Sequence, residues 1–505
     1  MRAFVALISI SDYDLVQQCV VHMSRTKRVS DNLISLEQGA KQRTRLRSDA
    51  LGLTSVLMQA IAHTAPATAI LLTVQFTVSQ AGVVGPLAYL VAFSIVLTLG
   101  VGVIQLARHL PSAGGYYTYV SRTVHARAGF LTAWLFFLYS ALTPAFSLAM
   151  MGSVLESSLR SQYSISFPWW LFLLIGAAFT AFVTYRGVDV SAKVLVSLGI
   201  LEVGCVMLLA TWGFISPGPG GVNFSSFNPA NAPSGNGLYL AIVFSIFALT
   251  GWEGAAPLAE ETKDPKRIVP RAILGAILLM GIYLVFTSWG IIIGWGTKHI
   301  AGFVSCKEVP AFVLARRFWG GGWVLLLFAL INSMVAVAVA TTLVSTRMWY
   351  AMARSGSLPR QLGNLHERYK TPVIAISFQT LVTVVFGIGM GLWIGPDQEF
   401  FLMGTVLTLA LAVIYTLGNL GVFLFYRKER RRDFHPVLHA VFPLVSSVAI
   451  AWVAYKSVVP LPTPPISYAP AIMVGWLAAG VVVLIVMKVI GQEQWLLRAG
   501  YAANE

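Results

Sequence analysis

Twelve apolar stretches, long enough for helices to cross a lipid bilayer, dominate this sequence and restrict what it can fold into. They cover residues 52–78, 82–106, 128–154, 168–185, 190–214, 238–258, 270–295, 322–349, 372–394, 401–425, 437–458 and 469–490. Hydrophobic residues make up 57% of the chain and charged residues 11%, which is far from the composition of a soluble domain. The sequence therefore predicts an all-α polytopic membrane protein with about twelve transmembrane helices, and the even number puts both termini on one side.

The basic residues predict which side that is, because Lys and Arg in short loops are retained in the cytoplasm. When the two tails and the even-numbered loops are taken as cytoplasmic, these segments and their helix edges hold 29 of the 35 Lys and Arg residues. We therefore expect a protein of the cell (cytoplasmic) membrane with both termini in the cytoplasm. The net charge of +15 is spread over short collars beside the helices, so it does not indicate a nucleic-acid partner.

This pattern divides the chain into a basic N-terminal tail over residues 1–50, a twelve-helix domain over 51–490 and a C-terminal tail over 491–505. Residues 1–22 make a poor signal peptide, so an upstream extension of a chain that starts at Met23 is an alternative. The three cysteines lie on different segments without metal-binding or disulfide spacing, and we predict no metal and no cofactor.

The sixth apolar stretch carries a carboxylate at bilayer depth, in the run Gly251-Trp252-Glu253-Gly254. The glycines let the backbone leave the helix, which is tolerated at that depth only against protein or a water-lined cavity. A charged Glu253 in hydrocarbon costs several kcal/mol unless it is paired, so such carboxylates usually face a cavity or a transport path. The run therefore predicts a helix break beside a solute site. The alternative for Glu253 is a capping group that accepts from the freed amides.

The first apolar stretch has Pro66 near its centre, where the ring clashes with the carbonyl of Ala62 and the helix should kink or break. A break frees the Ala62 carbonyl to coordinate a cation. It also turns the amides near Ala67 and Thr68 towards an anion such as a carboxylate. For a single proline the alternative is a kink that neighbouring helices repair.

The two interruptions fall in corresponding members of two five-helix halves, which indicates an inverted-repeat transporter with a site near the bilayer midplane. Other classes fit less well. The sequence has no G-x-x-x-x-G-K-[ST] loop for ATP hydrolysis, no channel filter and no clustered catalytic side chains, so we do not expect an enzyme, a pump or a channel. A major-facilitator transporter also has twelve spans but needs neither break.

Three stretches resemble the amino acid/polyamine/organocation superfamily of secondary transporters. They are residues 111–119 (PSAGGYYTY), the run over 251–273 that begins GWEG and ends EETKDPKRIVPRAI, and residues 345–359 (STRMWYAMARSGSLP). The resemblance covers about residues 45–490. It implies the LeuT fold, with a five-plus-five inverted repeat and broken helices 1 and 6.

The substrate-binding residues that this resemblance implies are Ala65, Ala67, Thr68, Phe247, Ala248, Leu249, Thr250 and Trp252. Amides of the first three would meet the carboxylate of an amino acid, and carbonyls over 248–250 would meet its ammonium group. Phe247 would close over the substrate and Trp252 would line the side-chain subsite. Ordinary packing is the alternative for both aromatic side chains.

Coupling residues are implied in the same way, and Glu253 would link conformational change to protonation. In the fifth span Glu202 stands where sodium-independent relatives often have a lysine in place of a cation, so the usual surrogate is missing. Glu202 could carry a second proton or help Asn332 and Ser333, together with the Ala62 carbonyl, to bind a cation. It could also serve only as a hydrogen-bond partner of a neighbouring helix.

Glu261 ends the sixth span, where a charge cluster is usually a solvated helix end. The resemblance implies that Glu261 and Arg347 form an inner gate, and an exposed pair worth about 0 to 1 kcal/mol would open easily.

Together these features predict a secondary active amino acid permease that imports its substrate with protons. Sodium-coupled or exchange transport of polyamines or organocations remains an alternative, as does a substrate sensor on the same fold that transports nothing. Neither the particular amino acid or amine nor the oligomeric state follows from the sequence.

Overall fold

The computed structural model describes residues 46–461 and 463–491, so most of the predicted N-terminal tail and residues 492–505 of the C-terminal tail lie outside the described residues. The described part is helical, and it contains no sheet beyond one isolated parallel bridge between Leu51 and Thr262. The predicted helical class is therefore confirmed for this part of the chain.

Helices occupy all of the predicted spans. The first five spans correspond to α2 (Leu53–Thr64), α3 (Pro66–Leu71) and α4 (Thr73–Ala81), then α5 (Gly85–His109), α7 (Ala126–Phe136) with α8 (Thr143–Tyr163), α9 (Trp169–Tyr185) and α10 (Val188–Ile215). The next five correspond to α11 (Gly235–Ala248) with the 3-10 segment η5 (Trp252–Glu261), then α12 (Pro265–Trp295), α15 (Val324–Arg354), α16 (Val373–Ile394) and α17 (Pro396–Lys428). The last two are α18 (Phe442–Lys456) and α19 (Ala469–Val489), and the short helices α6 (Tyr116–Thr123), α13 (Ile300–Val304) and α14 (Pro310–Trp319) lie in connections.

Ten helical stretches in the described residues are long and apolar enough to cross a membrane, against about twelve predicted. The difference has two sources. The first span is divided into short helices. Only the last of them, α4, belongs to a stretch that is long enough to cross a membrane, because it continues into α5 over Thr73–His109. The fourth span is the 17-residue helix α9, which is apolar but shorter than the other spans.

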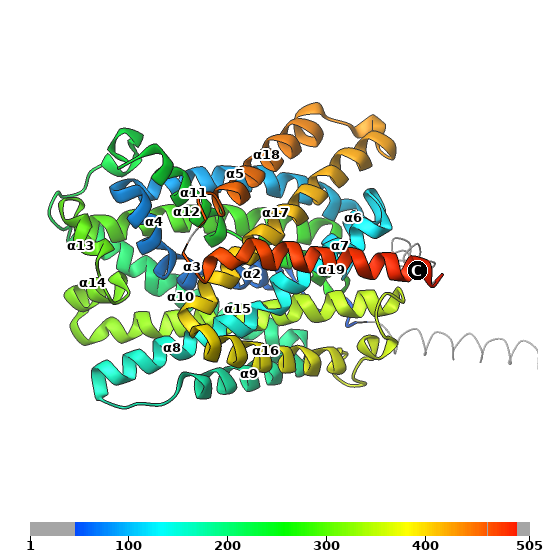
Figure 1. Cartoon of the computed structure of the whole chain (residues 1–505), viewed down its shortest axis with the longest axis horizontal. Coiled ribbons are helices and arrows are strands. Elements are labelled where there is room, and N and C mark those ends of the chain that lie inside the picture. The colour runs from blue at the N-terminus through cyan, green and yellow to red at the C-terminus, as the bar shows by residue number, and fades with distance from the viewer. Residues whose placement is uncertain (1–45, 462, 492–505) are drawn as a thin grey trace, which may run out of the picture. The chain divides into compact units, whose positions relative to one another are not determined.

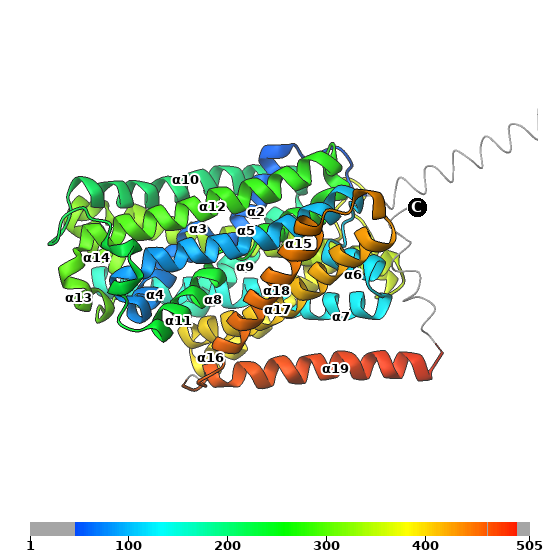
Figure 2. The ribbon, with the colours of Figure 1, turned by 90° about the horizontal axis from the view of Figure 1, so that it is seen from above.

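The helices pack in two groups. In the first, α5 lies along α12, and α12 also contacts α2 and α10. In the second, α8 contacts α9, α15 and α16. Figures 1 and 2 show the long helices side by side, with α10 and α12 neighbouring each other in both views. The helix α15 joins the groups, because it also contacts α2 and α10.

Large apolar side chains cover the outside of this bundle, as expected where lipid is the solvent. Leu381 and Val385 on α16 and Val474 on α19 are each more than half exposed. Figure 2 shows α19 at the edge of the bundle. It is attached by a reciprocal pair, because the Trp134 indole donates to the Trp476 carbonyl at 2.7 Å and the Trp476 indole donates back at 2.8 Å.

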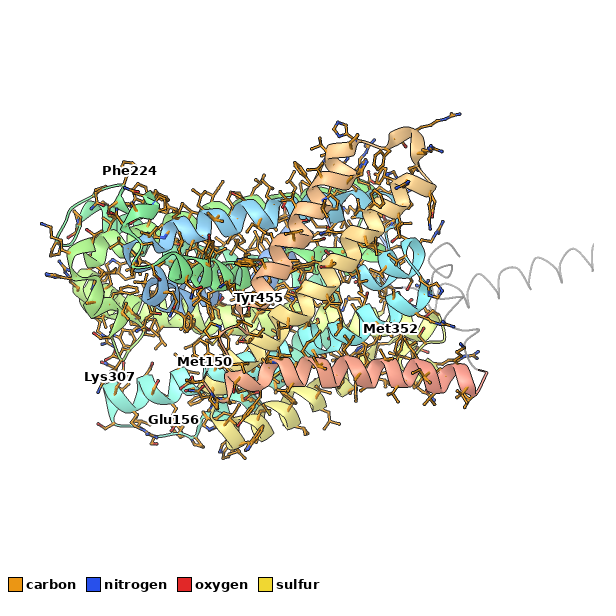
Figure 3. All side chains as sticks on the ribbon, turned by 45° about the horizontal axis from the view of Figure 1, so that its top comes forward. Met150, Glu156, Phe224, Lys307, Met352 and Tyr455 are labelled. Atoms are coloured by element: carbon orange, nitrogen blue, oxygen red, sulfur yellow. The ribbon has the colours of Figure 1, made fainter. Side chains whose placement is uncertain are left out.

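The connections alternate between the two ends of the bundle. Glu156 lies in the last turns of α8, and Phe224 and Lys307 lie in the connections after α10 and α12. Figure 3 shows all three towards one end. Met352, at the end of the eighth span, lies towards the other end (Figure 3). This alternation is what successive membrane crossings require.

Candidate functional site

The first helical interruption lies one residue before Pro66. Helix α2 ends at Thr64, and Ala65 adopts the left-handed conformation with a φ of 54°. Pro66 then opens α3 as its first residue, a position where the missing N–H costs nothing. The residue before a proline avoids the helical region, which explains why the chain turns at Ala65 and not at the proline itself.

The second interruption starts earlier than the run Gly251-Trp252-Glu253-Gly254 that we predicted. Helix α11 ends at Ala248, and residues 249–251 connect it to η5. Gly251 has a φ of 116°, a conformation that favours glycine because other residues clash there. Gly254 lies inside η5, so only the first of the two glycines makes the turn.

The two interruptions touch each other. A Cβ atom added to Gly251 would lie 2.6 Å from the backbone of His63 and Thr64, closer than non-bonded atoms can approach. A Cβ on Gly254 would lie 2.2 Å from Nδ1 of the His63 ring. Glycine is therefore required at both positions so that α2 and η5 can meet here.

We expect Gly251→Ala to destabilise the protein by at least about 1 to 3 kcal/mol, because it adds both left-handed strain and a backbone clash. Gly389→Ala in α16 is the matched control, since a Cβ there meets nothing within 4 Å and alanine favours a helix. Thermal unfolding of the purified proteins measures the difference. Equal midpoints for the two variants would contradict this geometry.

A cavity of about 60 Å³ lies at the two interruptions. Of the eight predicted substrate-binding residues, five line it, namely Ala65, Thr68, Phe247, Ala248 and Thr250. Hydroxyl groups of Thr143 and Ser147 on α8 and the apolar side chains of Phe146, Val337 and Phe400 complete much of the wall. The other three predicted residues, Ala67, Leu249 and Trp252, do not line it in this conformation.

A second cavity, of about 230 Å³, lies between α4, α11 and α17 and is also lined by Lys456 and the segment after α18. Thr73, Phe247 and Phe400 line both cavities. The two phenylalanine side chains thus border both cavities, and Gly404 of α17 leaves space for Phe247. Phe247 lines both cavities, and its closing over a substrate stays a prediction.

Glu253 does not line the smaller cavity, but it is buried near Tyr139, which does. Its Oε2 accepts from the Gly251 amide at 3.1 Å, which is the capping contact that we considered. The other oxygen, Oε1, has no hydrogen bond. The hydroxyl groups of Tyr139 and Tyr415 lie near enough to interact with the carboxylate, although neither makes a hydrogen bond of good geometry. Trp252 stacks on Tyr415 with ring centroids 5.4 Å apart.

Glu202 is buried against the start of α3. Its carboxylate lies close to the Ala67 amide and the Ser333 hydroxyl, again without a hydrogen bond of good geometry. Ser333 Oγ accepts from the Thr68 amide at 3.1 Å. Two of the amides predicted to meet a substrate carboxylate therefore face protein oxygens.

The remaining candidates for a cation site also have protein partners. The Ala62 carbonyl accepts from the Ala65 amide at 3.1 Å, and the Asn332 side chain donates to the Leu198 carbonyl at 2.9 Å. Ser333 accepts from the Thr68 amide. Each of the three predicted groups, on Ala62, Asn332 and Ser333, therefore already has a hydrogen-bond partner in its own helix or in a neighbouring one.

The Glu261 and Arg347 side chains form an ion pair, but its environment differs from the solvated helix end that we expected. Arg347 Nε lies 2.8 Å from Glu261 Oε2 and Nη2 lies 3.2 Å from Oε1, and the two side chains are 0% and 1% exposed. The Glu261 carbonyl accepts from the amides of Ala50 and Leu51, so the segment before α2 lies against Glu261.

The three stretches that carry the family resemblance converge beside this pair. The Ala113 amide donates to Glu260 at 3.2 Å, and Arg354 pairs with the same carboxylate at 2.7 Å. The Tyr117 hydroxyl lies 3.1 Å from the Ser355 hydroxyl. Burial raises the pKa of Tyr117 and keeps it neutral. Contacts among residues 111–119, 260–261 and 347–357 thus hold the helices together at this end of the bundle.

Sequence reasoning missed several polar groups near the site. The side chain of His63 lines the smaller cavity, and Tyr139 lies in the π-helical segment η2 (Phe137–Ala141). Nothing in the sequence distinguishes Tyr139 or Tyr415 from other tyrosines, since only packing brings them to Glu253. Glu399, at the start of α17, is buried, and neither of its carboxylate oxygens has a hydrogen bond. In the sequence, its position near the beginning of a span is typical of a residue at the membrane interface.

The model of the Amino acid permease family matches residues 51–487, and the chain belongs to this family. It is thus a multi-pass membrane transporter of the amino acid and polyamine permease type, not an enzyme, as the resemblance in the sequence predicted.

Curated relatives in the family have different substrates. The low-affinity putrescine importer PlaP of Escherichia coli K12 is 25% identical over 68% of this chain and 74% of its own length. The serine/threonine exchanger SteT of Bacillus subtilis is 24% identical over 72% of this chain and 80% of its own length. The lysine-specific permease LysP of Lactococcus lactis is 24% identical over 80% of this chain and 91% of its own length.

Proposed function

We propose that this protein is a secondary active permease that imports a small amino acid, or a related amine, together with protons. The observation that carries the proposal is the cavity at the two touching interruptions, with the buried carboxylate of Glu253 behind its wall residue Tyr139. Small-molecule sites are apolar cavities with a few polar groups, and the smaller cavity together with the larger one that shares Thr73, Phe247 and Phe400 has this character. An intramembrane carboxylate next to it suits a proton-linked step.

In this proposal the interruptions are the broken helices 1 and 6 of a five-plus-five inverted repeat. The permease domain spans 51–490, between tails at 1–50 and 491–505. Packing supports the scheme, because the helices that carry the interruptions contact each other and also contact α5 and α12, the second members of each half. Ala65, Thr68, Phe247, Ala248 and Thr250 would contact substrate in the described conformation. Ala67, Leu249 and Trp252 would act, if at all, in another conformation.

Glu253 is the coupling residue in this proposal, and Glu202 has the supporting role of holding the start of α3 against α15. The alternative is a cation held near Ala62, Asn332 and Ser333, which would make the protein sodium-coupled. A second alternative is exchange, which the similarity to a serine/threonine exchanger supports. A substrate sensor would bind the same ligands without flux.

The inner gate in this proposal is the pair Glu261–Arg347, with Glu260–Arg354 beside it. Burial makes the first pair stronger than the exposed pair that the sequence suggested, so its separation requires water or a moving helix to reach both groups. The described conformation is then closed at this end, with the larger cavity at the opposite end.

We expect this closed end to face the cytoplasm. In a variant with the native cysteines Cys19, Cys205 and Cys306 replaced, single cysteines at residues 263–267 and 427–432 should react with a membrane-impermeant maleimide only after the cells are permeabilised. Lys307→Cys is the control that should react from outside, since Lys307 is exposed at the other end of the bundle. External labelling of either cytoplasmic set would reverse the orientation.

Uptake by the purified protein in liposomes tests the function itself. The amino acids, together with putrescine and cadaverine, are screened as labelled substrates under an imposed inward proton gradient, an imposed sodium gradient, or unlabelled substrate inside. The proposal expects one group of related compounds to accumulate with the proton gradient. Binding without flux of any compound would favour the sensor, and sodium-driven uptake would move the coupling role to the cation-site residues.

A further inference from the structure

A groove on the outside of the bundle lies between α17 and α18, which run side by side in Figures 1 and 2. Its volume is about 430 Å³, and it shares no lining residue with the two cavities described above. Leu420 of α17 and Leu444 of α18 line it and are 43% and 66% exposed. The groove therefore opens towards the surrounding lipid.

The polar side chains in the wall of this groove already have protein partners. Thr416 Oγ1 donates to the carbonyl of Ala412 at 2.7 Å. The amide group of Asn419 donates to the hydroxyl oxygens of Ser446 and Ser447 at 3.0 and 2.9 Å, which also ties α17 to α18. An occupant therefore meets mainly apolar surface, and a hydrocarbon chain fills such a surface better than a polar ligand does.

One end of the groove lies among basic residues. Phe423 lines the groove, and the guanidinium carbon of Arg427, one turn further along α17, lies 5.5 Å from the centre of its ring. The ring of Phe434, in the connection to α18, lies 6.4 Å from the same ring. This connection therefore packs against the end of the groove, directly after the basic run over 428–432 (KERRR).

Most of the positive charge at this end is uncompensated. The two acidic residues of the segment, Glu429 and Asp433, are already paired with arginines at 3.9 and 3.4 Å. The exposed cations that form no ion pair within the described residues are Lys428, Arg431 and Arg432. Cations beside a membrane attract anionic headgroups, so this end of the groove suits a phosphate.

The length of the groove fits one leaflet of a bilayer. Thr416 and Arg427 are eleven residues apart in α17, and at a rise of 1.5 Å per residue they are separated by about 16 Å. This is about half of the roughly 30 Å of hydrocarbon in a bilayer. When the phosphate of a lipid lies at Arg427, its acyl chain can follow the groove to Thr416.

We propose that the groove between α17 and α18 binds an anionic phospholipid, with an acyl chain along Leu420 and Leu444 and the phosphate among the basic residues over 427–432. A second copy of this chain fits the same face less well. Two-fold symmetry would place the same groove of both copies face to face and bring their uncompensated cations together.

Native mass spectrometry of the purified, delipidated full-length protein tests this proposal, since it counts the lipids bound to each protein. The probes are phosphatidylglycerol and phosphatidylcholine with identical acyl chains, and sn-glycerol 1-phosphate as the headgroup without chains. Each Lys or Arg near the phosphate contributes about fivefold in affinity. We therefore expect the first phosphatidylglycerol to bind at least about 10-fold more tightly than phosphatidylcholine, and the headgroup alone not to bind.

Two variants separate the headgroup site from the groove. Arg431→Gln/Arg432→Gln should weaken phosphatidylglycerol about 10- to 30-fold and leave phosphatidylcholine unchanged. Leu444→Trp places a larger side chain in the groove and should weaken both lipids about 10-fold, as the exclusion of about two methylene groups would.

Each variant has a matched control. Lys266→Gln/Arg271→Gln removes two exposed cations of α12, which do not border the groove. Leu392→Trp adds the same bulk on α16, at a side chain that is 69% exposed, against 66% for Leu444. Both controls should bind the lipids as the wild type does.

The proposal is supported if one phosphatidylglycerol is lost in both groove variants and kept in both controls. It is wrong if phosphatidylcholine binds as tightly, if the headgroup alone binds as tightly, or if a control weakens binding as much as its variant. Dimers that Leu444→Trp dissociates and Leu392→Trp does not would show that the groove holds a second copy instead. None of these outcomes changes the proposed solute site.

Discussion

Arg347→Met should lower the stability of the protein by about 3 to 5 kcal/mol, since it leaves the Glu261 carboxylate buried without its partner. The cost is large because both side chains are almost completely inaccessible to water. Thermal unfolding followed by size-exclusion chromatography measures the loss as a fall in the midpoint temperature. The double variant Arg347→Met/Glu261→Leu should regain most of it, since two apolar residues leave no charge unpaired.

The neighbouring pair provides the control for this prediction. Arg354 and Glu260 form an ion pair at 2.7 Å, but their side chains are 32% and 26% exposed. Water therefore screens much of the attraction between the two charges and can solvate either one alone. We expect Arg354→Met to cost no more than about 1 kcal/mol. A loss in Arg347→Met as small as that in Arg354→Met would show that the inner pair is not buried as described.

Glu253→Gln should abolish proton-driven accumulation and leave binding and exchange of substrate in place. The amide resembles the protonated acid and can still accept from the Gly251 amide, but it cannot release a proton. An inward gradient of one pH unit, about 1.4 kcal/mol per proton, supports up to about tenfold accumulation in a one-proton symporter. In the variant this should fall to the level without a gradient, and uptake should lose its pH dependence.

Glu202→Gln is the comparison for coupling, and it should change accumulation less because Glu202 faces the start of α3, whereas Glu253 lies near Tyr139 in the wall of the cavity. If the Glu253→Gln variant still accumulates substrate with an unchanged pH profile, Glu253 is only a capping group. Glu202 then becomes the leading candidate for the coupling residue. Uptake driven by sodium alone would remove both carboxylates from the coupling role.

The spans could be predicted because the bilayer imposes a length and a composition on each of them. Their interruptions were also visible, since Pro66 and Gly251 restrict the backbone wherever they occur. The predicted positions differ from the structure by one to three residues, because α2 ends at Thr64, before Pro66, and α11 ends at Ala248, before Gly251. Proline and glycine determine the region in which a helix ends. The contacts between α2 and η5 determine the residue at which it ends.

The surroundings of the site could not be predicted in the same way. Glu253 stood out as a carboxylate in an apolar run, but the tyrosines beside it and the ring of His63 depend on which helix faces fit together. The burial of Glu261 was missed for a related reason. A charged residue at the end of a span resembles a solvated one until the backbone at Ala50 and Leu51 is placed against it.

The most direct measurement of the central claim is an experimental structure of the purified protein with the compound that it accumulates in liposomes. The account predicts density for that compound between the two interruptions, in contact with residues 63–68 of the first span and 247–250 of the sixth. Density at another place, or first and sixth spans that run as continuous helices, would contradict it.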